Sequence, residues 1–547
     1  MTPARDALDD EPVTFNLAEL FERVADAVPD REAVVTPVRR ETFRELDDRA
    51  NRLAHHLRSA GVGPGDHVGL QLMNGTEYLE AMLAAFKLRA VPVNINYRYV
   101  EAELEYLYDN ADIVALVYDD RFAERVLAAR RSATALRHLI AVGGGEPAIP
   151  ASVEYEDALL AASTGRDFSD RSGDDRYIAY TGGTTGLPKG VLWRHEDIFF
   201  AAMGGGDPTT LAGPIEQPDE IVARVLPVPA AMLMTPPLVH VSAQWGAFSM
   251  MYGGSKVVLT SPGSFDPVEV LRLVELESVN VLTLVGDAMA RPVLDALASR
   301  PGAFDLSSLL VFASGGAVLS TSTKAQVAAL LPGVIAIDGF GSTETGVTGT
   351  RARMPGAAVE EGTRFTVDDR TEVLDEHLRP VGCGTGEIGH LARRGHLPLG
   401  YYKDPSKSAA LIVEIGGERW VLTSDAATVD ADGTVVLLGR GSASINTGGE
   451  KVYPEEVEAV VKNHPAVYDA VVVGAPDERW GERVVTVAEL RPGATLTLDE
   501  LTRHCRKSLA GYKLPRALLA VEHVERGPNG KADYRWAREY ALTTLEG

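Results

Sequence analysis

Residues suited to bind an anion gather in the segment 181–190, which reads Thr-Gly-Gly-Thr-Thr-Gly-Leu-Pro-Lys-Gly. Apolar runs at 177–180 and 191–193 flank it, so we expect a loop between two strands, with a helix beginning near His195. Glycines let backbone N–H groups approach a ligand, threonine hydroxyls add donors, and Lys189 adds a positive charge. The segment is therefore suited to phosphates, and a nucleoside triphosphate is the obvious candidate.

This segment differs from the P-loop of kinases and ATPases. Gly190 follows Lys189 where the P-loop has Ser or Thr, and the spacing of the glycines also differs. A glycine cluster alone is usually an ordinary surface loop. The complete string, which ends in Pro188-Lys189-Gly190, is much rarer, and it resembles the phosphate-binding motif of the adenylate-forming superfamily. That superfamily contains acyl-CoA synthetases, peptide-synthetase adenylation domains and luciferases.

A second motif combines an aromatic ring, hydroxyls and a carboxylate in Phe340-Gly341-Ser342-Thr343-Glu344, after the apolar run 334–337. The ring can stack on adenine, Thr343 can donate to a phosphate, and Glu344 offers a hard oxygen ligand for Mg²⁺. Taken alone, the pattern also fits a strand-end turn with a solvated glutamate. It resembles the aromatic-Gly-x-Thr-Glu motif of the family, in which Tyr usually stands at the position of Phe340.

The resemblance implies further nucleotide contacts. The turn Ser314-Gly315-Gly316-Ala317 resembles the adenine-side turn, Asp425 matches the ribose-binding aspartate, and Arg440 matches an arginine that contacts the ribose or phosphate. A Gly-Gly after a strand is often only a turn, and most arginines lie at the surface. The predicted nucleotide-binding residues are Thr181, Gly182, Gly183, Thr184, Thr185, Lys189, Gly315, Gly316, Ala317, Asp338, Gly339, Phe340, Gly341, Ser342, Thr343, Asp425, Arg440 and Lys531.

Lys531 ends the segment Gly527-Pro528-Asn529-Gly530-Lys531 and matches the catalytic lysine of the family. The resemblance gives its partners as the substrate carboxylate and oxygens near the α-phosphate. A flexible cation suits a position where negative charge accumulates. A Gly-Lys pair near the end of a chain is otherwise usually a solvated loop. The predicted catalytic residues are Lys531, Glu344 and Thr181, and Glu344 is also the predicted Mg²⁺ ligand.

Two other segments concern a second reaction step. Ser442 stands where the family has its hinge residue, usually Asp or Lys, so it keeps a permissive backbone but brings no charge. The loop Thr447-Gly448-Gly449-Glu450-Lys451 resembles the lining of the family's thiol tunnel, which makes Gly448, Gly449 and Glu450 the predicted coenzyme A contacts. Alone, the loop is also compatible with a Gly-Gly hairpin turn.

His240 follows the apolar stretch 236–239 and resembles the histidine at the mouth of the family's acyl pocket. A histidine on an apolar stretch is more often a core residue. We assign it to positioning, because a carboxylic acid is already ionised at neutral pH and needs no general base. By the same analogy, the predicted pocket residues are His240, Val241, Ala243, Gly286, Asp287, Gly315 and Gly339. Several are small, which leaves room for a wide acid, although small residues at strand ends are also ordinary packing.

The composition excludes several classes of protein. With 45% apolar residues the chain suits a globular protein, and its net charge of −24 disfavours binding to nucleic acid. The two cysteines, Cys383 and Cys505, imply neither a disulfide framework nor a zinc site. The acidic N-terminus is no signal peptide, and prolines break the most apolar stretch, 226–254, so we expect no membrane segment and a cytoplasmic location.

The order of patterns predicts an α/β fold. Apolar runs at 68–73, 90–95, 113–118 and 139–142 alternate with helical patterns, as in substantially parallel sheets, and those at 281–285 and 309–313 continue in a second sheet region. Asn16 and Thr42 each precede a helical pattern as a cap. The resemblance adds a small β-barrel-like subdomain to these two sheet subdomains.

The pattern changes near residue 440. Helices are expected at 455–462 and 498–509, and strands at 434–438, 470–473, 484–490 and 518–524. We therefore expect an AMP-binding domain at 1–440 and a small mobile α+β domain at 441–547, with the boundary uncertain by a few residues.

The resemblance covers nearly the whole chain and implies an ATP-dependent acid–CoA ligase with ATP/AMP, Mg²⁺ and coenzyme A. Segments 192–197, 286–292 and 446–451 are most similar to actinobacterial synthetases for steroid side-chain and other bulky acids. Steroid, terpenoid and long fatty acids all remain candidates. Two alternatives stay open, a stand-alone enzyme that loads a carrier protein and a catalytically idle nucleotide-binding protein. A homodimer is among the alternatives for assembly.

Overall fold

The computed structural model describes residues 14–183, 186–207, 212–359, 363–440, 444–447, 450–477, 480–527 and 530–546. These residues pack as two compact units. The first comprises the described residues up to Tyr180, with Leu192–Pro229 and Trp245–Val257. The second comprises Thr181–Val191, Ala230–Gln244 and the described residues from Val258 onward. The boundary predicted between residues 440 and 441 adjoins residues outside this description and stays a prediction.

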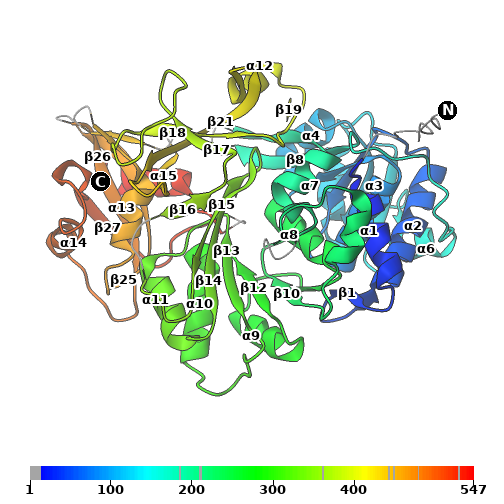
Figure 1. The fold of residues 1–547 in the computed structure, drawn as a ribbon, viewed down its shortest axis with the longest axis horizontal. Helices are drawn as coiled ribbons and strands as arrows, with labels where there is room; N and C mark the ends of the chain where they lie inside the picture. The colour runs from blue at the N-terminus through cyan, green and yellow to red at the C-terminus, as the bar shows by residue number, and fades with distance from the viewer. Residues whose placement is uncertain are drawn as a thin grey trace, which may run out of the picture. The chain divides into compact units, whose positions relative to one another are not determined.

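A parallel sheet organises the first unit (Figure 1). The pairings among six of its strands are all parallel, as the alternating sequence pattern predicted. In sheet order the strands are β8 (Arg176–Gly183), β4 (Val91–Asn94), β3 (His67–Gln71), β5 (Ile113–Asp119), β6 (His138–Val142) and β7 (Val153–Glu154). Every residue of β3 and β4 is buried, which is typical of parallel strands covered on both faces.

The first unit also contains helices and a short hairpin. Asn16 caps the first helix by accepting from the N–H groups of Ala18 and Glu19, and Thr42 and Glu45 form a capping box, so both predicted caps are confirmed. The helices are α1 (Leu17–Ala27), α2 (Phe43–Ser59), α3 (Thr76–Lys87), α4 (Glu101–Asn110), α5 (Ala123–Ala129), α6 (Tyr155–Leu160) and α7 (His195–Ala202). The strands β1 (Glu32–Val35) and β2 (Arg40–Thr42) pair as an antiparallel hairpin.

The main sheet of the second unit begins parallel and continues antiparallel. Its parallel strands are β10 (Ala231–Met234), β12 (Val281–Leu284), β13 (Val311–Gly315) and β14 (Ile335–Ser342). The antiparallel continuation contains β15 (Gly346–Arg353), β16 (Arg364–Val367), β22 (Val435–Arg440), β21 (Glu418–Val429), β18 (Gly389–Arg394) and β17 (Thr371–Leu374), with β20 (Ile412–Ile415) beside β21. This continuation is the predicted small β subdomain.

Further elements complete this part of the second unit. They are the helices α9 (Pro267–Leu276), α10 (Gly286–Ala298), α11 (Thr321–Leu330) and α12 (Pro405–Leu411) and the short strand β19 (Gly400–Tyr401). Three elements run across the border between the two units, namely β9 (Gly186–Arg194), α8 (Val241–Tyr252) and β11 (Lys256–Leu259).

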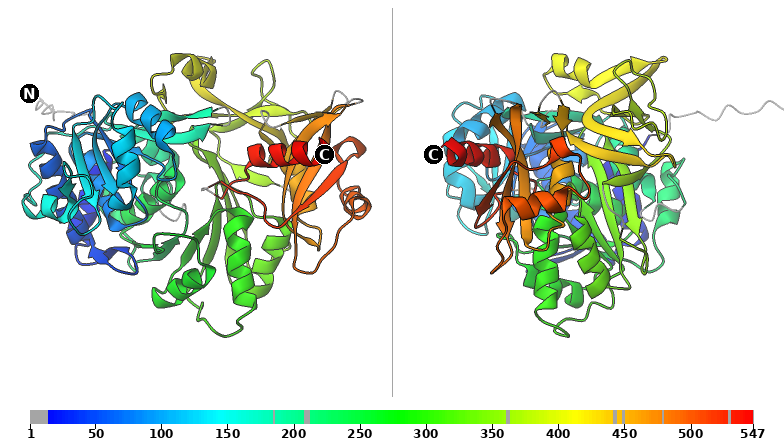
Figure 2. Two further views of the ribbon diagram at one scale, coloured as in Figure 1. Left: turned by 180° about the vertical axis from the view of Figure 1, so that it is seen from behind. Right: turned by 90° about the vertical axis from the view of Figure 1, so that its left-hand side faces the viewer.

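The C-terminal part has its own sheet and core (Figure 2, orange and red). Its strands are β23 (Ile445–Thr447), β24 (Glu450–Val452), β25 (Val467–Asp477), β26 (Gly481–Leu490) and β27 (Ala517–Val521), and its helices are α13 (Pro454–Val461), α14 (Leu498–Cys505) and α15 (Tyr534–Glu546). Alternate residues of β25 contribute to two separate apolar clusters. One cluster contains residues of α13 and α14 and the other contains residues of α15, so helices cover both faces of the sheet.

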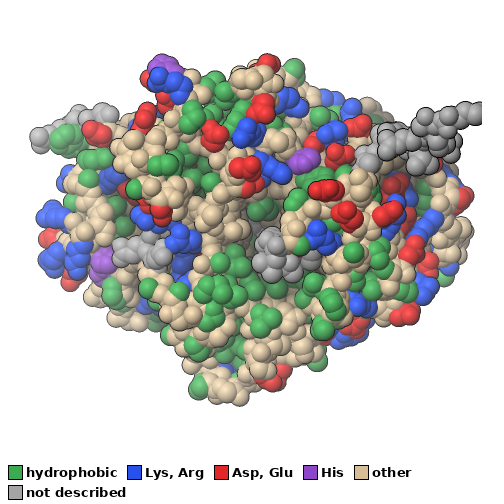
Figure 3. All heavy atoms as spheres, viewed as in Figure 1, with side chains coloured by type: hydrophobic (Ala, Val, Ile, Leu, Met, Phe, Trp, Pro, Cys, Tyr) green, Lys and Arg blue, Asp and Glu red, His purple; other side chains and the backbone are tan. Residues whose placement is uncertain are grey.

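The surface and the helices agree with a globular protein. Figure 3 shows acidic and basic side chains interspersed over the displayed face. Within the described part of the chain, no helix combines the length and the apolar character that crossing a bilayer requires.

Candidate active site

A lysine, a tyrosine and a glutamate from separate elements meet in the second unit. Lys189 lies on β9, Tyr401 on β19, and Glu344 in the turn after β14. The Lys189 ammonium donates to the Tyr401 hydroxyl at 2.5 Å and lies 3.1 Å from Oε1 of Glu344. The Tyr401 hydroxyl donates to the same carboxylate oxygen at 2.8 Å. The structure thus joins two residues predicted from the sequence through a third that was not predicted.

The surroundings of Glu344 favour its ionised form. Burial by itself raises the pKa of a carboxyl group, because a charge is costly away from water. The Lys189 charge and the hydrogen bond from Tyr401 outweigh this effect and hold the pKa of Glu344 below its ordinary value. A fixed negative charge and a cation are therefore available side by side, the combination that a metal-bound polyphosphate requires.

The predicted adenine-side turn follows β13 and is held by Ser314. The Ser314 hydroxyl accepts from the Gly286 N–H at 2.9 Å and donates to the Ala317 carbonyl at 2.7 Å. Gly316 has a φ of +79°, a conformation that favours glycine. A Cβ built on Gly315 meets no described atom within 4 Å. The backbone of this turn is therefore open to the approach of a planar group.

Lys531 lies against the same turn. A Cβ built on Gly316 would lie 3.7 Å from Cε of Lys531, a distance of ordinary van der Waals contact. The preceding residue, Gly530, approaches Val285 so closely that a Cβ on it would lie 3.0 Å from Cγ1 of Val285. The predicted catalytic lysine and the predicted adenine-side glycines are therefore neighbours in space.

The turn after β14 presents Thr343 and Glu344. The Ser342 N–H donates to Oγ1 of Thr345 at 3.1 Å, which fixes this turn. Gly341 leaves no room for a side chain, because a Cβ there would lie 2.1 Å from the Gly346 carbonyl oxygen. The ring of Phe340 packs against Phe365 with the ring centres 5.3 Å apart, and this contact fixes its orientation.

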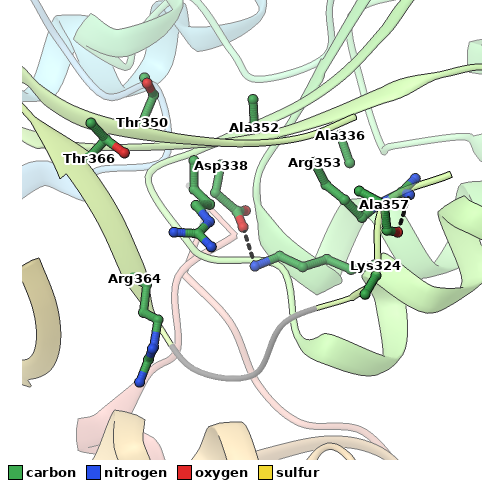
Figure 4. Close-up of a pocket in the computed structure, with 11 residues that line it drawn as sticks. Lys324, Ala336, Asp338, Thr350, Ala352, Arg353, Ala357, Arg364 and Thr366 are labelled. Carbon is green, nitrogen blue, oxygen red and sulfur yellow. Dashed lines mark hydrogen bonds and ion pairs between the residues drawn. The ribbon is translucent and has the colours of Figure 1, made fainter. Parts of the chain in front are cut away.

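The carboxylate of Asp338 faces a cavity of about 370 Å³ (Figure 4). Lys324 lies 2.5 Å from Asp338 Oδ2, and the Leu319 N–H donates to Oδ1 at 3.0 Å. Burial raises the pKa of Asp338 above its usual value despite the lysine. The cavity is lined by Lys324, Ala336, Asp338, Thr350, Arg351, Ala352, Arg353, Ala357, Ala358, Arg364 and Thr366. Because Lys324 and Leu319 already contact this carboxylate, we expect Asp338 to contact a nucleotide through its backbone.

Asp425 and Arg440, the predicted ribose contacts, are opposite one another on β21 and β22. The Asp425 N–H donates to Oγ1 of Thr423 at 3.2 Å, and the Asp425 side chain is partly exposed. Residues directly opposite in an antiparallel pair are close neighbours. The sheet register therefore gives the two residues the proximity that contacts to one ribose require.

Five of the seven predicted acyl-pocket residues lie near the amino ends of two helices, while Gly315 and Gly339 lie on β13 and β14. Val241 and Ala243 begin α8 and are buried, and His240 precedes them. Gly286 begins α10, while the Asp287 carboxylate accepts from the Ser320 N–H at 2.9 Å and pairs with Arg291 at 3.1 Å. The Asp287 carboxylate therefore has a structural role, and we expect Asp287 to contact an acyl group, if it does so, through its other atoms.

Several predicted residues receive little or no description. Thr184, Thr185, Ser442, Gly448 and Gly449 lie outside the described residues. Thr181, Gly182 and Gly183 end β8, and a Cβ built on Gly182 meets no described atom within 4 Å. Glu450 begins β24 and is exposed. The hinge and the coenzyme A contacts therefore stay predictions.

Sequence reasoning missed Tyr401, although a signal was present. Two tyrosines follow Gly400 at a position where the chain has just left β18, and adjacent aromatics after a glycine turn are unusual at an exposed surface. Tyr401 is separated in the sequence from Lys189 by 212 positions and from Glu344 by 57. Its role could be recognised only when the fold brought the three residues together.

Comparison with known proteins supports the same assignment. The profile of the AMP-binding enzyme family matches residues 21–402, and that of the AMP-binding enzyme C-terminal domain matches residues 456–531. The chain is 45% identical over 537 residues to the 3-oxocholest-4-en-26-oate–CoA ligase of Rhodococcus rhodochrous, with 96% of each chain covered. It is equally 45% identical to a medium/long-chain-fatty-acid–CoA/3-oxocholest-4-en-26-oate–CoA ligase of Mycobacterium marinum, again with 96% of each chain covered.

A solved structure agrees at the level of the fold. The anthranilate CoA ligase AuaEII in complex with anthranoyl-AMP superposes with a TM-score of 0.84 at 24% identity, over 98% of this chain and 99% of the other. The family profiles and the relatives over nearly full length lead to one conclusion: the chain belongs to the AMP-binding enzyme family, within the adenylate-forming superfamily that includes the acyl-CoA synthetases.

Proposed function

We propose that the protein is an ATP-dependent acid–CoA ligase for a bulky carboxylic acid. The observation that carries the proposal is the contact of Lys531 with the Gly316 turn, in the same unit as the Lys189–Tyr401–Glu344 cluster. The two lysines provide positive charge, Lys531 for the acid carboxylate and the α-phosphate and Lys189 for the outer phosphates. The named activities of the relatives support coenzyme A as the final acceptor.

In the first step, a carboxylate oxygen attacks the α-phosphorus of ATP, and pyrophosphate leaves with the electron pair of the broken P–O bond. The product is an acyl-adenylate, whose AMP is a good leaving group. Two anions must approach each other, so positioned cations and N–H donors lower the barrier. Lys531 serves the carboxylate and the α-phosphate, while Lys189 and the backbone of Thr181, Gly182 and Gly183 serve the outer phosphates.

Glu344 is the residue of this chain that suits Mg²⁺. Mg²⁺ commonly uses one or two carboxylates together with substrate phosphates and water, and the ionised Glu344 beside Lys189 meets that requirement. When bound, the ion would neutralise phosphate charge and orient the pyrophosphate leaving group. Tyr401 holds the Glu344 carboxylate in place for this purpose.

In the second step, the thiolate of coenzyme A attacks the acyl carbon and AMP leaves. Lys531 lies at the adenine-side turn, so the thiol needs another approach. We propose that rotation about Ser442 withdraws Lys531 and brings Gly448, Gly449 and Glu450 to line the thiol's path. The separate core of the C-terminal part supports movement as a body, because its sheet packs mainly against its own helices.

We propose a steroid side-chain, polycyclic terpenoid or long-chain fatty acid as the substrate. Relatives covering 96% of this chain are named for a steroid acid or for medium and long fatty acids. Small residues at the predicted pocket, such as Ala243 and Gly286, agree with a wide acid. We also propose a cytoplasmic location, consistent with the acidic composition of the chain.

Acid-dependent exchange of labelled pyrophosphate into ATP tests the first step. We expect exchange with at least one bulky acid, followed by formation of its CoA thioester. A competition among steroid, terpenoid and fatty acids would identify the class. ATP binding without exchange across that panel would instead indicate an idle nucleotide-binding protein. Single-turnover reactions with coenzyme A and with a phosphopantetheinylated carrier protein would separate the two acceptors.

A further inference from the structure

Arg291 is a buried arginine that joins the main sheet part of the second unit to its C-terminal part. It lies on α10 and is 2% exposed. On its own side, Nε donates to Oγ1 of Thr323 at 3.1 Å, and one terminal nitrogen donates to the hydroxyls of Ser320 and Ser322 at 3.0 and 2.9 Å. The carboxylate of Asp287 lies 3.1 Å away. The guanidinium is thus oriented by four side chains.

The same guanidinium reaches two carbonyl groups of the C-terminal part. It donates to the Tyr468 carbonyl and, at 3.4 Å, to the Lys462 carbonyl. Lys462 is the C-cap of α13, where carbonyls lack partners within the helix and carry partial negative charge. Arg291 therefore bridges both ends of the connection between α13 and β25, which a planar fork of donors can do.

A second contact from the same helix pair strengthens this bridge. The Ser322 N–H at the start of α11 donates to Oδ1 of Asn463 at 3.2 Å, and the Ser322 hydroxyl donates to the Lys462 carbonyl at 3.2 Å. The bound segment, residues 462–468, is hereafter the docking loop. The hydrogen bonds that this loop receives from α10 and α11 come from Arg291 and Ser322.

A rigid path leads from the docking loop to Lys531. Asp469, the residue after the loop, forms two hydrogen bonds with Arg526 at 2.6 and 2.7 Å. Burial by itself would raise the pKa of Asp469, but Lys462 and Arg526 lower it to about 2, so the pair is ionised. Arg526 also donates to the Gly530 carbonyl at 3.0 Å, and Lys531 follows Gly530.

We infer that Arg291 is a positioning residue for the first half-reaction. It holds the docking loop, and through Asp469, Arg526 and Gly530 it sets the place of Lys531 against the Gly316 turn. The start of α10 supports the same geometry from the other side, because Val285, its N-cap, is the residue that Gly530 approaches. This inference rests on the proposed function, and it adds a named residue that favours the adenylate-forming arrangement of the C-terminal part.

The test separates the two half-reactions in the full-length protein. For Arg291→Ala we expect pyrophosphate exchange to fall on the order of 10²-fold, the loss associated with a small misplacement of a catalytic group. Formation of thioester from a supplied acyl-adenylate and coenzyme A should stay within about twofold of wild type, because that step does not use Lys531 in this place. Arg291→Lys should lose most of the exchange as well, because an ammonium group cannot bridge both carbonyls.

A double variant tests the route of the effect. If Arg291 acts through Lys531, Arg291→Ala/Lys531→Ala should exchange no more slowly than Lys531→Ala alone. Arg393 supplies a matched control, because it is also buried but bonds only to Asp368 and Thr371 among its described hydrogen-bond partners. Arg393→Ala should lower both half-reactions to a similar extent, if it lowers either.

Other outcomes would overturn the inference. Equal loss of both half-reactions in Arg291→Ala, full retention of exchange, or additive losses in the double variant would each do so. If Arg291→Ala fails to fold, the double variant Arg291→Leu/Asp287→Asn avoids leaving the buried Asp287 carboxylate without its arginine. Full exchange in that double variant would also overturn the inference. Absence of exchange in the wild-type protein would instead contradict the proposed function, before any variant is compared.

Discussion

The Tyr401 hydroxyl donates to Oε1 of Glu344 at 2.8 Å while the Lys189 ammonium lies 4.0 Å from the centre of the Tyr401 ring. One phenol therefore contacts both charged residues of the phosphate site. Tyr401 therefore adds to the effect of the Lys189 charge in favouring the ionised form of Glu344, and it also orients this carboxylate.

Tyr401→Phe should move the acidic limb of the rate profile to higher pH. Burial opposes the ionisation of Glu344, and Lys189 and Tyr401 together overcome it to lower the pKa of this carboxyl. Loss of the hydroxyl removes one of the two, so the pKa rises and a higher pH is needed to ionise the group. Pyrophosphate exchange measured from below the ordinary pKa of a glutamate, about 4.3, up to neutral pH would reveal the shift. An unchanged profile would mean that the phenol does not influence Glu344.

Glu344→Ala should weaken the binding of Mg²⁺ that supports the first step. The carboxylate is the group we assign to the ion, and removal of one ligand or charge-stabilising group typically costs about 10²–10³-fold in rate. The concentration of Mg²⁺ giving half-maximal exchange should rise, while thioester formation from supplied adenylate should change much less. If that concentration stays the same, Glu344 does not hold the metal.

Lys531→Ala should strongly reduce adenylate formation, leaving a small residual exchange, and largely spare thioester formation. We expect a loss of at least about 10²-fold in exchange, because the lysine neutralises charge that develops between two anions. Thioester formation from a supplied acyl-adenylate does not need this cation in the site. Equal losses in both half-reactions would contradict the role assigned to Lys531.

Much of the architecture could be predicted because its determinants are local. Asn16 and the Thr42–Glu45 pair cap helices through contacts within four residues, and the apolar runs in the parallel sheets report burial on both faces. The end of α14 was predicted less well. Leu509 is buried in the same cluster as the helix, yet the helix ends at Cys505. Apolar periodicity thus indicated the burial of Leu509 but not its conformation.

The site was predicted as far as motif resemblance extends. Lys189, Glu344 and Lys531 occur in short recognisable strings, whereas Tyr401 and Arg291 do not. The importance of these two depends on contacts across more than a hundred residues, with Lys189 and with the docking loop respectively. The resemblance names Asp287 and Asp338 as ligand contacts, and the structure shows their carboxylates paired with Arg291 and Lys324, so their contact with a ligand stays a prediction.

Glu41→Gln should make the stability of the first unit less sensitive to pH. Glu41, on β2, and Glu80, on α3, are buried at 2% and 0% exposure. Burial, and then the neighbouring Glu80, raise the pKa of Glu41 to about 8. A carboxyl whose pKa is higher in the folded than in the unfolded protein makes its full contribution to stability at pH values below its unfolded pKa. That contribution is lost as the pH rises through the folded pKa.

Thermal unfolding between about pH 5 and 9 checks this prediction. The melting temperature of the wild type should fall as pH rises toward 9, and that of the variant should fall less. Each kcal/mol of lost stability lowers the melting temperature by about 2–4 °C. Glu45→Gln is a control for helix capping in the same region, because its carboxylate accepts from the Thr42 N–H at 2.8 Å at an exposed position. Parallel curves for wild type and Glu41→Gln would show that Glu41 is ionised in the folded state at neutral pH.

The docking loop is recognised by Arg291 through main-chain carbonyl oxygens, atoms that every amino acid carries. These two hydrogen bonds therefore do not depend on the side chains at positions 462 and 468, although Lys462 also lowers the pKa of Asp469 and the Tyr468 ring lies beside Arg291. Methods that detect contacts from correlated substitutions between positions would not register the pairing. The two main-chain contacts of an arginine that we infer to position Lys531 thus need no partner side chain that varies with it.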